Sequence, residues 1–481
     1  MPRIDTGPGS TFRFVVGLVA AALAIIALAV ALVMGNLRAE VNARRERLHR
    51  AGVPLALSEL TPSPVPDDQN AAPLYQKAFN RLQVQRVDIT ALRSFIAPNT
   101  RKPVRAEVER WVSDNDGVFG LLEDAARRPY CRFPVDWQAP NPLELPILHT
   151  RVMAVCSHFL HARAIMVLED GRYSDAVADC RTALAMSSHV AQDPLMPSLS
   201  MACSIRASTF DVLRQVMERA QLDPATRRAL FNELAKPDDR RLYAKAAAAQ
   251  SISATWCFDA AGSHSGNLRE YLASGTFSSG PRPWAPLVAL YLSPLGRPIR
   301  LREEVEYLDR LERGLAFAEL PYREAAPRYR KIMDEIAGAP GYCLLTRLSG
   351  DLYFRDQDPL WREQSFAEQG ATQVPLALEA YRAEHGGYPD SLDDARAPRK
   401  VGAGASPTSS VVWAEDEPLP YELPEDPFSG KPFGYRREGR GFVIYSWGGD
   451  LDDDVGRELD YATTTYYWKP PNGDLVWRFW N

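Results

Sequence analysis

The feature that most constrains this chain is an uncharged apolar run near its beginning, FVVGLVAAALAIIALAVALVM at residues 14–34. At about 1.5 Å per residue, a helix of this length crosses a hydrocarbon core of about 30 Å. The apolar region of a cleaved signal peptide is usually shorter, and the following GNLRAEVNARRER offers no good small-residue cleavage site. The run therefore predicts a single transmembrane helix that anchors the protein.

Arginines flank this span unevenly and leave its orientation open. Only Arg3 and Arg13 precede it, whereas a group follows it closely: Arg38, Arg44, Arg45, Arg47 and Arg50. The positive-inside rule, applied literally, keeps the body in the cytoplasm, but the rule weakens when a long domain follows the span. Glu40 and Glu46 lie among these arginines, so the stretch also fits a charged helical stalk.

The rest of the chain has the composition of a folded globular protein, with 24% charged and 46% hydrophobic residues. Because 481 residues are too many for one ordinary core, we expect two or three domains. The net charge of -5 argues against a nucleic-acid-binding protein, which would need a strongly basic surface. Nucleic acid is therefore not an expected partner.

Apolar residues recur at helical spacing over most of the body. The clearest helix pair covers residues 148–186, where Gly171 can end the first helix. Tyr173, Ala176 and Ala183 stand where a tetratricopeptide-type helix pair has aromatic and small residues. No second copy follows at a fixed period, so an ordinary antiparallel pair in an α-bundle is the alternative. Further helices are predicted at residues 195–220, 224–235, 239–259 and 301–320, with a Gly/Ser-rich loop at 260–283.

Cysteine and histidine give weaker signals. Six cysteines lie far apart, without a CxxC pair: Cys131, Cys156, Cys180, Cys203, Cys257 and Cys343. Buried free thiols and at least one disulfide are both open alternatives. His158 and His161 lie three residues apart and can share a helix face, but no acidic or thiol partner stands at helical spacing. We therefore expect packed or surface histidines rather than a metal site.

The sequence changes character after a helix predicted at residues 359–384. Several motifs follow in a fixed order: Tyr381, Gly387-Tyr388-Pro389, Leu423-Pro424, Asp426-Pro427, Gly430-Lys431-Pro432, the strands GYR and FVIYSWG, and an acidic loop after Gly448. This order resembles the C-terminal domain of the major pseudopilins of type II secretion. The final TTTYYWKPPNGDLVWRFWN predicts one more hairpin, with a turn at Asn472-Gly473.

The resemblance implies a small α+β domain outside the cytoplasm, carried by a protein of the bacterial inner membrane. It also implies a link to secretion or envelope assembly. A pseudopilin has a glutamate near the start of its span, and the span leads directly into the module. Here the span contains no glutamate and a long body separates it from the module. We therefore expect a reused domain rather than a filament subunit.

The acidic loop DLDDDVG contains the one predicted ion site. Its carboxylates alternate at Asp450, Asp452 and Asp454, a spacing that can direct oxygen ligands toward a hard cation such as calcium. The pseudopilin module carries calcium in the corresponding loop, so the resemblance also implicates Asp450 and its acidic neighbours. Val455 and Tyr461 replace the glycine and glutamate of an EF-hand loop. A solvated acidic turn is therefore the alternative.

These observations predict a mainly α fold in five segments. They are an N-terminal tail (1–13), a transmembrane helix (14–34), a charged stalk with a proline-rich linker (35–73), an α-helical domain (74–358) and a pseudopilin-like α+β domain (359–481). No Walker A, GxSxG, HExxH or dinucleotide-binding pattern occurs, so no catalytic or cofactor-binding residue is identified.

We expect a membrane-anchored structural or protein-binding protein with its body outside the cytoplasm. Its expected partners are the membrane, through the N-terminal helix, and unidentified proteins, and calcium is its one predicted cofactor. The alternative is a membrane-anchored enzyme whose site is formed by residues distant in sequence. A long, shallow concave face would favour the first function, and a deep pocket with convergent ionisable groups would favour the second.

Overall fold

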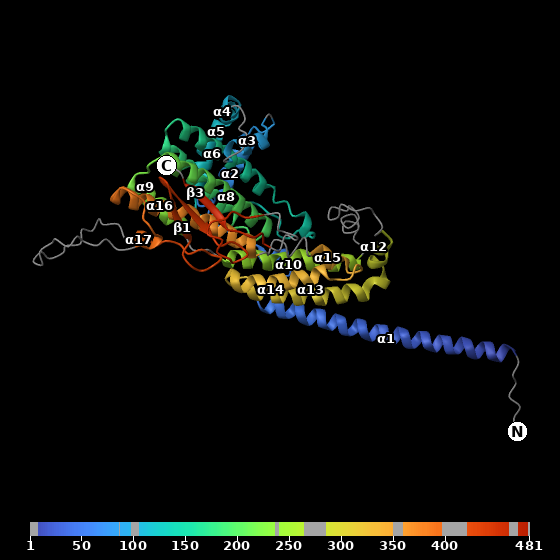
Figure 1. Ribbon diagram of the computed structural model, residues 1–481. Coiled ribbons are helices and arrows are strands. Elements are labelled where there is room, and N and C mark those ends of the chain that lie inside the picture. Colours follow the sequence, from blue (N-terminus) through green and yellow to red (C-terminus); the bar gives the residue numbers. More distant parts are fainter. Residues whose placement is uncertain are drawn as a thin grey trace, which may run out of the picture. The chain divides into compact units, whose positions relative to one another are not determined.

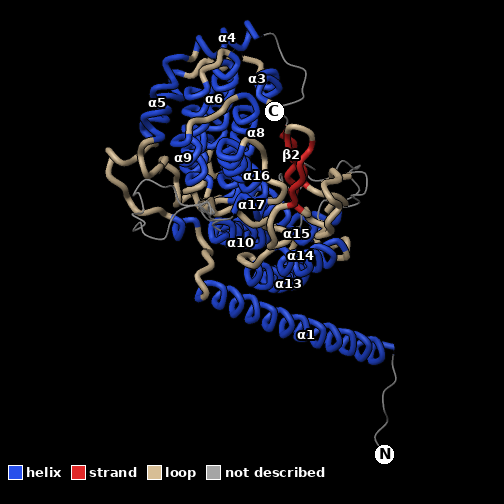
Figure 2. The backbone as a smooth tube through the Cα atoms, turned by 60° about the vertical axis from the view of Figure 1, so that its left-hand side comes forward, coloured by secondary structure: helices blue, strands red, loops and turns tan. Residues whose placement is uncertain are grey.

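The computed structural model describes residues 8–85, 87–97, 105–235, 240–263, 285–349, 359–396, 421–460 and 470–479. The fold is mainly α-helical with one small sheet, as predicted (Figures 1 and 2). The chain divides into two compact units built from segments distant in sequence. The first unit comprises Met1–Glu59, Ser251–Ala316 and Ile332–Phe354. The second comprises Leu60–Gln250, Phe317–Lys331 and Arg355–Asn481.

The first unit begins with one long helix, α1 (Pro8–Arg50), which has two different halves. Every side chain from Phe12 to Val33 is exposed, so the apolar run is not covered by any other described segment of the chain. This half is long and apolar enough to cross a membrane. Beyond it, Val41 and Leu48 are buried, and their spacing of seven places them on one helix face. The helix continues beyond the span as predicted, but this part packs against the first unit and is not a solvated stalk.

The remaining helices of the first unit follow in part from the sequence. They are the second part of α10 (Arg240–Ser263), α12 (Ala285–Leu292), η3 (Pro294–Gly296), most of α13 (Arg297–Phe317), the end of α14 (Tyr322–Ala337) and α15 (Leu344–Ser349). The helix predicted at 239–259 continues to Ser263, so the start of the Gly/Ser-rich stretch is helical, and residues 264–283 lie outside the described ones. Pro298 falls in the first turn of α13, where proline is tolerated.

The second unit holds most of the helices. Its short N-terminal elements are η1 (Leu57–Leu60, shared with the first unit), α2 (Ala72–Arg81), α3 (Ile89–Ile96), α4 (Arg105–Asp114), α5 (Asp116–Ala126) and η2 (Pro142–Glu144). Longer helices follow: α6 (Leu148–Glu169), α7 (Tyr173–Val190), α8 (Met196–Arg219), α9 (Pro224–Leu234), α16 (Pro359–His385) and the short α17 (Leu392–Arg396). The proline-rich residues 53–73 form no continuous helix, as expected.

Helices α6 and α7 form the predicted hairpin, and α8 packs against both. Gly171 ends α6 with a positive φ of 79°, which a glycine adopts without steric cost. Cys156 and Leu160 of α6 and Ala176 and Cys180 of α7 are fully buried. Helix α6 is also apolar enough to cross a membrane, but most of it is buried in this core. All six cysteines are buried free thiols, so the disulfide alternative is wrong.

The sheet lies near the C-terminus and has the antiparallel order β1-β2-β3, formed by β1 (Gly434–Glu438), β2 (Gly441–Ser446) and β3 (Leu475–Phe479). In its register Tyr435 faces Ile444, which in turn faces Trp477. All six residues of β2 are buried, so neither of its faces lies in solvent. The last predicted strand exists and pairs with β2, while residues 461–469 lie outside the described ones.

The residues that carry the pseudopilin resemblance hold this sheet together. Asp426 is fully buried, and its carboxylate accepts hydrogen bonds from the Ser446 hydroxyl of β2 (2.6 Å) and from the Ser429 amide (3.1 Å). The ring of Tyr388 lies 4.7 Å from that of Phe442 in an edge contact. These motif residues therefore fix the crossover that precedes β1 onto the central strand.

Candidate docking groove

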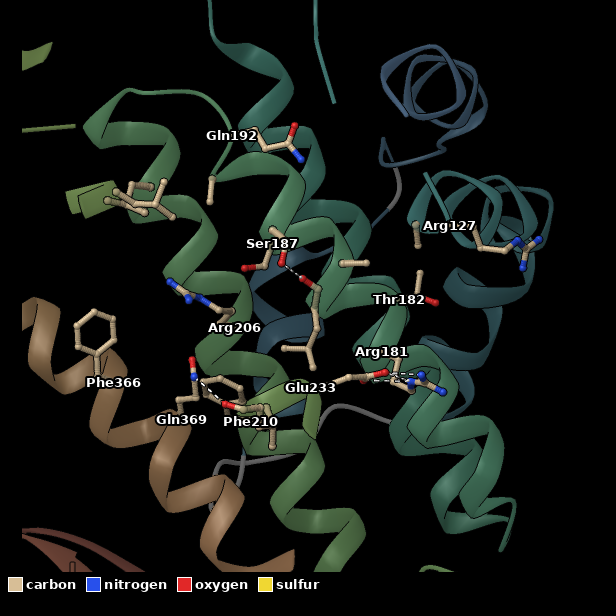
Figure 3. Close-up of a pocket in the computed structure, with 18 of the residues that line it drawn as sticks. Arg127, Arg181, Thr182, Ser187, Gln192, Arg206, Phe210, Glu233, Phe366 and Gln369 are labelled. Carbon is tan, nitrogen blue, oxygen red and sulfur yellow. Dashed lines mark hydrogen bonds and ion pairs between the residues drawn. The ribbon is translucent and has the colours of Figure 1, made fainter. Parts of the chain in front are cut away.

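An open groove of about 660 Å³ lies in the second unit, along the outer face of α7 (Figure 3). Residues of α5, α8, α9, the first part of α10 and α16 form its walls. Two phenylalanines, Phe210 of α8 and Phe366 of α16, line the walls and are labelled in Figure 3. The groove is therefore assembled from segments spread over a large part of the chain.

The floor of the groove consists mainly of small side chains on α7. Ala178, Arg181, Ala185 and Ser188 follow one another at spacings of three or four, so they share one helix face. Three of these four have side chains no larger than a hydroxymethyl group. Helices pack at interaxial distances of about 8–10 Å, and small residues permit the closer end of that range. This face can therefore accept another helix without displacing bulky side chains.

Many polar groups of the groove are bound by other groups of the protein. The Nε of Arg181 donates to both carboxylate oxygens of Glu233 on α9, at 2.9 and 3.1 Å. The side-chain amide of Gln369 on α16 donates to the Leu234 carbonyl at 2.8 Å. Gln192 accepts from the Cys131 amide at 3.0 Å. The first two bonds join α7 and α16 to α9.

The charges that line the groove are unequal. Three arginines (Arg127, Arg181 and Arg206) line it, against two glutamates (Glu123 and Glu233). Glu233 is bound by Arg181, and Glu123 is bound at 2.8 Å by Arg163, which lies outside the lining. Arg127 is bound in turn by Asp124, which lies just outside the lining. Counted with these partners, the charges of the groove are largely balanced.

An imidazole, a carboxylate and a hydroxyl meet next to the end of α7, but not in catalytic order. His149 Nε2 lies 2.8 Å from Asp193 Oδ2, and the Ser198 hydroxyl donates to the same oxygen at 3.3 Å. In a nucleophilic triad the hydroxyl would contact the imidazole, so that the base could take its proton. Here Asp193 separates the two groups, and the cluster ties α6 to the start of α8.

His161 is fully buried and His158 is partly buried, which agrees with the packed alternative. His161 donates from Nε2 to the Thr209 hydroxyl at 2.8 Å, and that hydroxyl donates to the Ile205 carbonyl. Burial, and to a lesser degree the neighbouring His158, lowers the pKa of His161 to about 3. Burial lowers the pKa of His158 to about 4. Both rings therefore remain neutral at physiological pH.

The three aspartates of the acidic loop make separate contacts. Asp450 accepts from the Gly473 amide at 2.8 Å, Asp454 binds Arg457 at 2.5 Å, and Asp452 is exposed. Across the described parts of the chain, no three His, Cys, Asp or Glu side chains are grouped so as to hold a metal. Calcium binding by this loop stays a prediction.

Sequence reasoning missed the groove residues. The signal that could have revealed them is the run of small residues at helical spacing on the α7 face opposite Ala176, Val177 and Cys180. The chain matches no family model, and neither the curated proteins nor the solved structures contain a match.

Proposed function

We propose that this protein is a single-span membrane protein whose body binds a helical segment of a partner protein in the α7 groove. The observation that carries the proposal is an open groove with a floor of small residues, many of whose own polar groups are already paired. An enzyme site would instead gather ionisable groups around a reacting atom. The lining described above contains no nucleophile in contact with a base.

The exposed half of α1 supports the membrane part of the proposal. Its large apolar side chains, such as Phe14 (70% exposed) and Ile25 (68% exposed), are mostly uncovered by the described part of the protein. Transfer of each such side chain from water to an apolar medium is favourable by about 1.5–3 kcal/mol of free energy. A run of this length therefore strongly favours a bilayer over solvent.

The pseudopilin resemblance supports placing the body outside the cytoplasm, on the outer side of the inner membrane, in secretion or envelope assembly. A reporter enzyme fused after Asn481 tests this placement. We expect activity from a reporter that works only outside the cytoplasm, and none from a reporter that works only inside. The reverse result would mean that the arginines after the span set the topology.

The chemistry of the groove defines its partner. The small floor and the apolar walls fit the apolar face of a helix. We therefore expect an amphipathic helix. Because the charges of the groove are already paired within the protein, binding should rest mainly on apolar contact and depend little on moderate salt.

The experiment has two stages. A photo-crosslinking residue at Ser188 in the full-length protein, in its native membrane, identifies the neighbour of the groove. The affinity of the full-length protein for that neighbour's helix is then measured for two matched variants. Ala185→Arg fills the floor and should weaken binding at least about tenfold, or 1.4 kcal/mol. Ala106→Arg, on the exposed surface of α4, should bind like the parent. Equal affinity of both variants would overturn the proposal.

A further inference from the structure

The turn between α12 and α13, in the first unit, exposes apolar side chains to its surroundings. Leu295 in η3 is 79% exposed, and Leu290 near the end of α12 is 46% exposed. Leu295 is thus more exposed than Phe14, at 70%, on the apolar half of α1. Single exposed leucines are common, but these two lie together on a turn that is held rigidly.

Arg300 fixes the backbone of this turn. Its guanidinium is buried and donates to the Ser293 carbonyl at 3.0 Å and to the Tyr291 carbonyl. At Gly296 a Cβ atom would lie 2.2 Å from the Tyr291 carbonyl oxygen. The turn therefore requires glycine at this position and a buried cation beneath it.

Glu303 fixes the turn from a second side. One of its carboxylate oxygens accepts from the Tyr291 hydroxyl, and the other accepts from the Thr346 amide at 3.1 Å. Tyr291 is itself almost completely buried. Tyr291 and Gly296 are buried, whereas the residues directly before them, Leu290 and Leu295, are exposed.

Ion pairs set the register of α1 against α13. Arg44 binds Asp309 at 3.1 Å, and Arg47 lies 3.7 Å from Glu312. The residue numbers rise together along both helices, so the two helices run in the same direction. Moving toward the start of α13 therefore means moving toward the apolar half of α1.

This register places the exposed leucines at the level where the apolar run ends. Glu40 and Arg302 line the same gap between the two helices. From Glu40 back to Met34 is about 9 Å along the helix at 1.5 Å per residue, and the start of α13 is a similar distance from Arg302. Figure 1 shows α12 at the end of α13 that lies toward the N-terminal half of α1.

We propose that Leu290 and Leu295 insert into the membrane surface beside the span, as a second lipid contact of the first unit. The inference rests on the proposed membrane anchoring, because it is the span that brings this turn to the bilayer. Apolar side chains at the boundary between headgroups and acyl chains are a common means of interfacial attachment. One span alone leaves the body free to rotate about it, whereas a second contact fixes which side of the first unit faces the lipid.

Spin labels at three positions test this in the full-length protein, reconstituted into phosphatidylcholine and phosphatidylglycerol vesicles. Cysteine replaces Leu295, Ile25 in the middle of the span, or Glu46, whose side chain is 70% exposed on the stalk. The native thiols are buried, so the labelled parent chain supplies the background. Collisions with oxygen, which concentrates in lipid, are compared with collisions with a water-soluble nickel chelate.

We expect the ratio of oxygen to nickel collisions to be highest at Ile25→Cys, lowest at Glu46→Cys, and at least about threefold higher at Leu295→Cys than at Glu46→Cys. A water-like ratio at Leu295→Cys, with Ile25→Cys in lipid, would overturn the inference and leave the anchor intact. Few collisions of either kind at Leu295→Cys would indicate a protein cover and would also overturn it. A water-like ratio at Ile25→Cys would refute the anchor itself.

Discussion

Two helix interfaces, one in each unit, are built from opposite kinds of residues. In the second unit, α6, α7 and α8 meet through alanines, cysteines and aliphatic side chains such as Leu160, with neutral histidines among them. In the first unit, α1 meets α13 through arginine–carboxylate pairs. Arg45, for example, binds Glu304 at 2.7 Å and Asp259 at 2.9 Å. The first interface relies on the exclusion of water, and the second combines paired charge with the burial of Val41 and Leu48.

This difference predicts that the two interfaces respond differently to mutation, pH and salt. Burial of apolar surface is insensitive to moderate salt, whereas partly exposed ion pairs are screened. Because the chain has two units, one global unfolding free energy is not well defined. Hydrogen–deuterium exchange, read separately for α6–α8 and for α13, measures each interface by itself.

The largest effect should come from a cavity in the apolar interface. Leu160→Ala removes a fully buried side chain and should lower the local unfolding free energy of α6–α8 by about 2–5 kcal/mol. Leu148→Ala removes the same atoms from the same helix, where the leucine is 68% exposed, and should change it by less than about 0.5 kcal/mol. Similar values for the two variants would show that α6 is not packed as described.

The second-largest effect should be a loss of stability of the second unit in acid. The folded pKa of His161, about 3, lies below the unfolded value of 6.5, so its neutral form stabilises the fold above pH 6.5 and this contribution is lost as pH falls toward 3. At pH 5 the loss from His161 alone is about 2 kcal/mol. Exchange of α6–α8 amides at pH 7.5 and pH 5.0, corrected for intrinsic rates, measures it. His161→Gln should reduce this pH dependence, and an unchanged dependence would contradict the assignment.

A smaller effect is expected at the charged interface. Arg45→Gln leaves Glu304, whose side chain is 7% exposed, without its cation and should cost α13 about 1 kcal/mol, since Arg45 itself is only partly buried. Arg50→Gln removes an arginine of the same helix that is 69% exposed and should have no measurable effect. In 1 M salt the difference between the two variants should shrink. A salt-independent difference would mean that packing, not charge, holds α1.

Calcium should have the smallest effect, because Asp450 and Asp454 already have partners. If the ion binds Asp450, Asp452 and Asp454, millimolar calcium should raise the melting temperature of the protein by a few degrees through mass action, and magnesium should raise it less. Asp452→Ala combined with Asp454→Ala should remove the rise. A melting curve that is identical in calcium and in chelator would leave an acidic turn held by its internal hydrogen bonds.

Local signals in the sequence predicted local structure well. Gly171 marked the end of α6, and the run FVIYSWG marked β2, because a helix end or a strand depends on neighbouring residues. Helices α14 and α15 went unpredicted. Proline at position 327 reads as a helix breaker, yet it lies inside α14, and the helix continues past it although the bond to the Arg323 carbonyl is lost.

Contacts between distant segments could not be predicted in the same way. Arg45 has many carboxylates within the chain as possible partners, and nothing in the sequence singles out Asp259 and Glu304. The groove has the same origin, since its lining comes from six helices that only the tertiary fold brings together. In the acidic loop, by contrast, a local pattern was not enough. The spacing of its aspartates suggested that their carboxylates point to a common centre. The backbone turns at Leu451 and Val455, both with positive φ, and the carboxylates have different neighbours.

The unbroken course of α1 has a mechanical consequence. The helix passes from its apolar half into the stalk without a joint, and residues 35–50 extend it by roughly 24 Å. In a bilayer such a helix acts as a lever, because any lean of the span is transmitted undiminished to the end that holds Val41 and Leu48. A span adjusts to bilayer thickness largely by tilting, at a cost of fractions of a kcal/mol per Å of mismatch. A thinner or thicker membrane would thus change the angle at which the first unit stands above it.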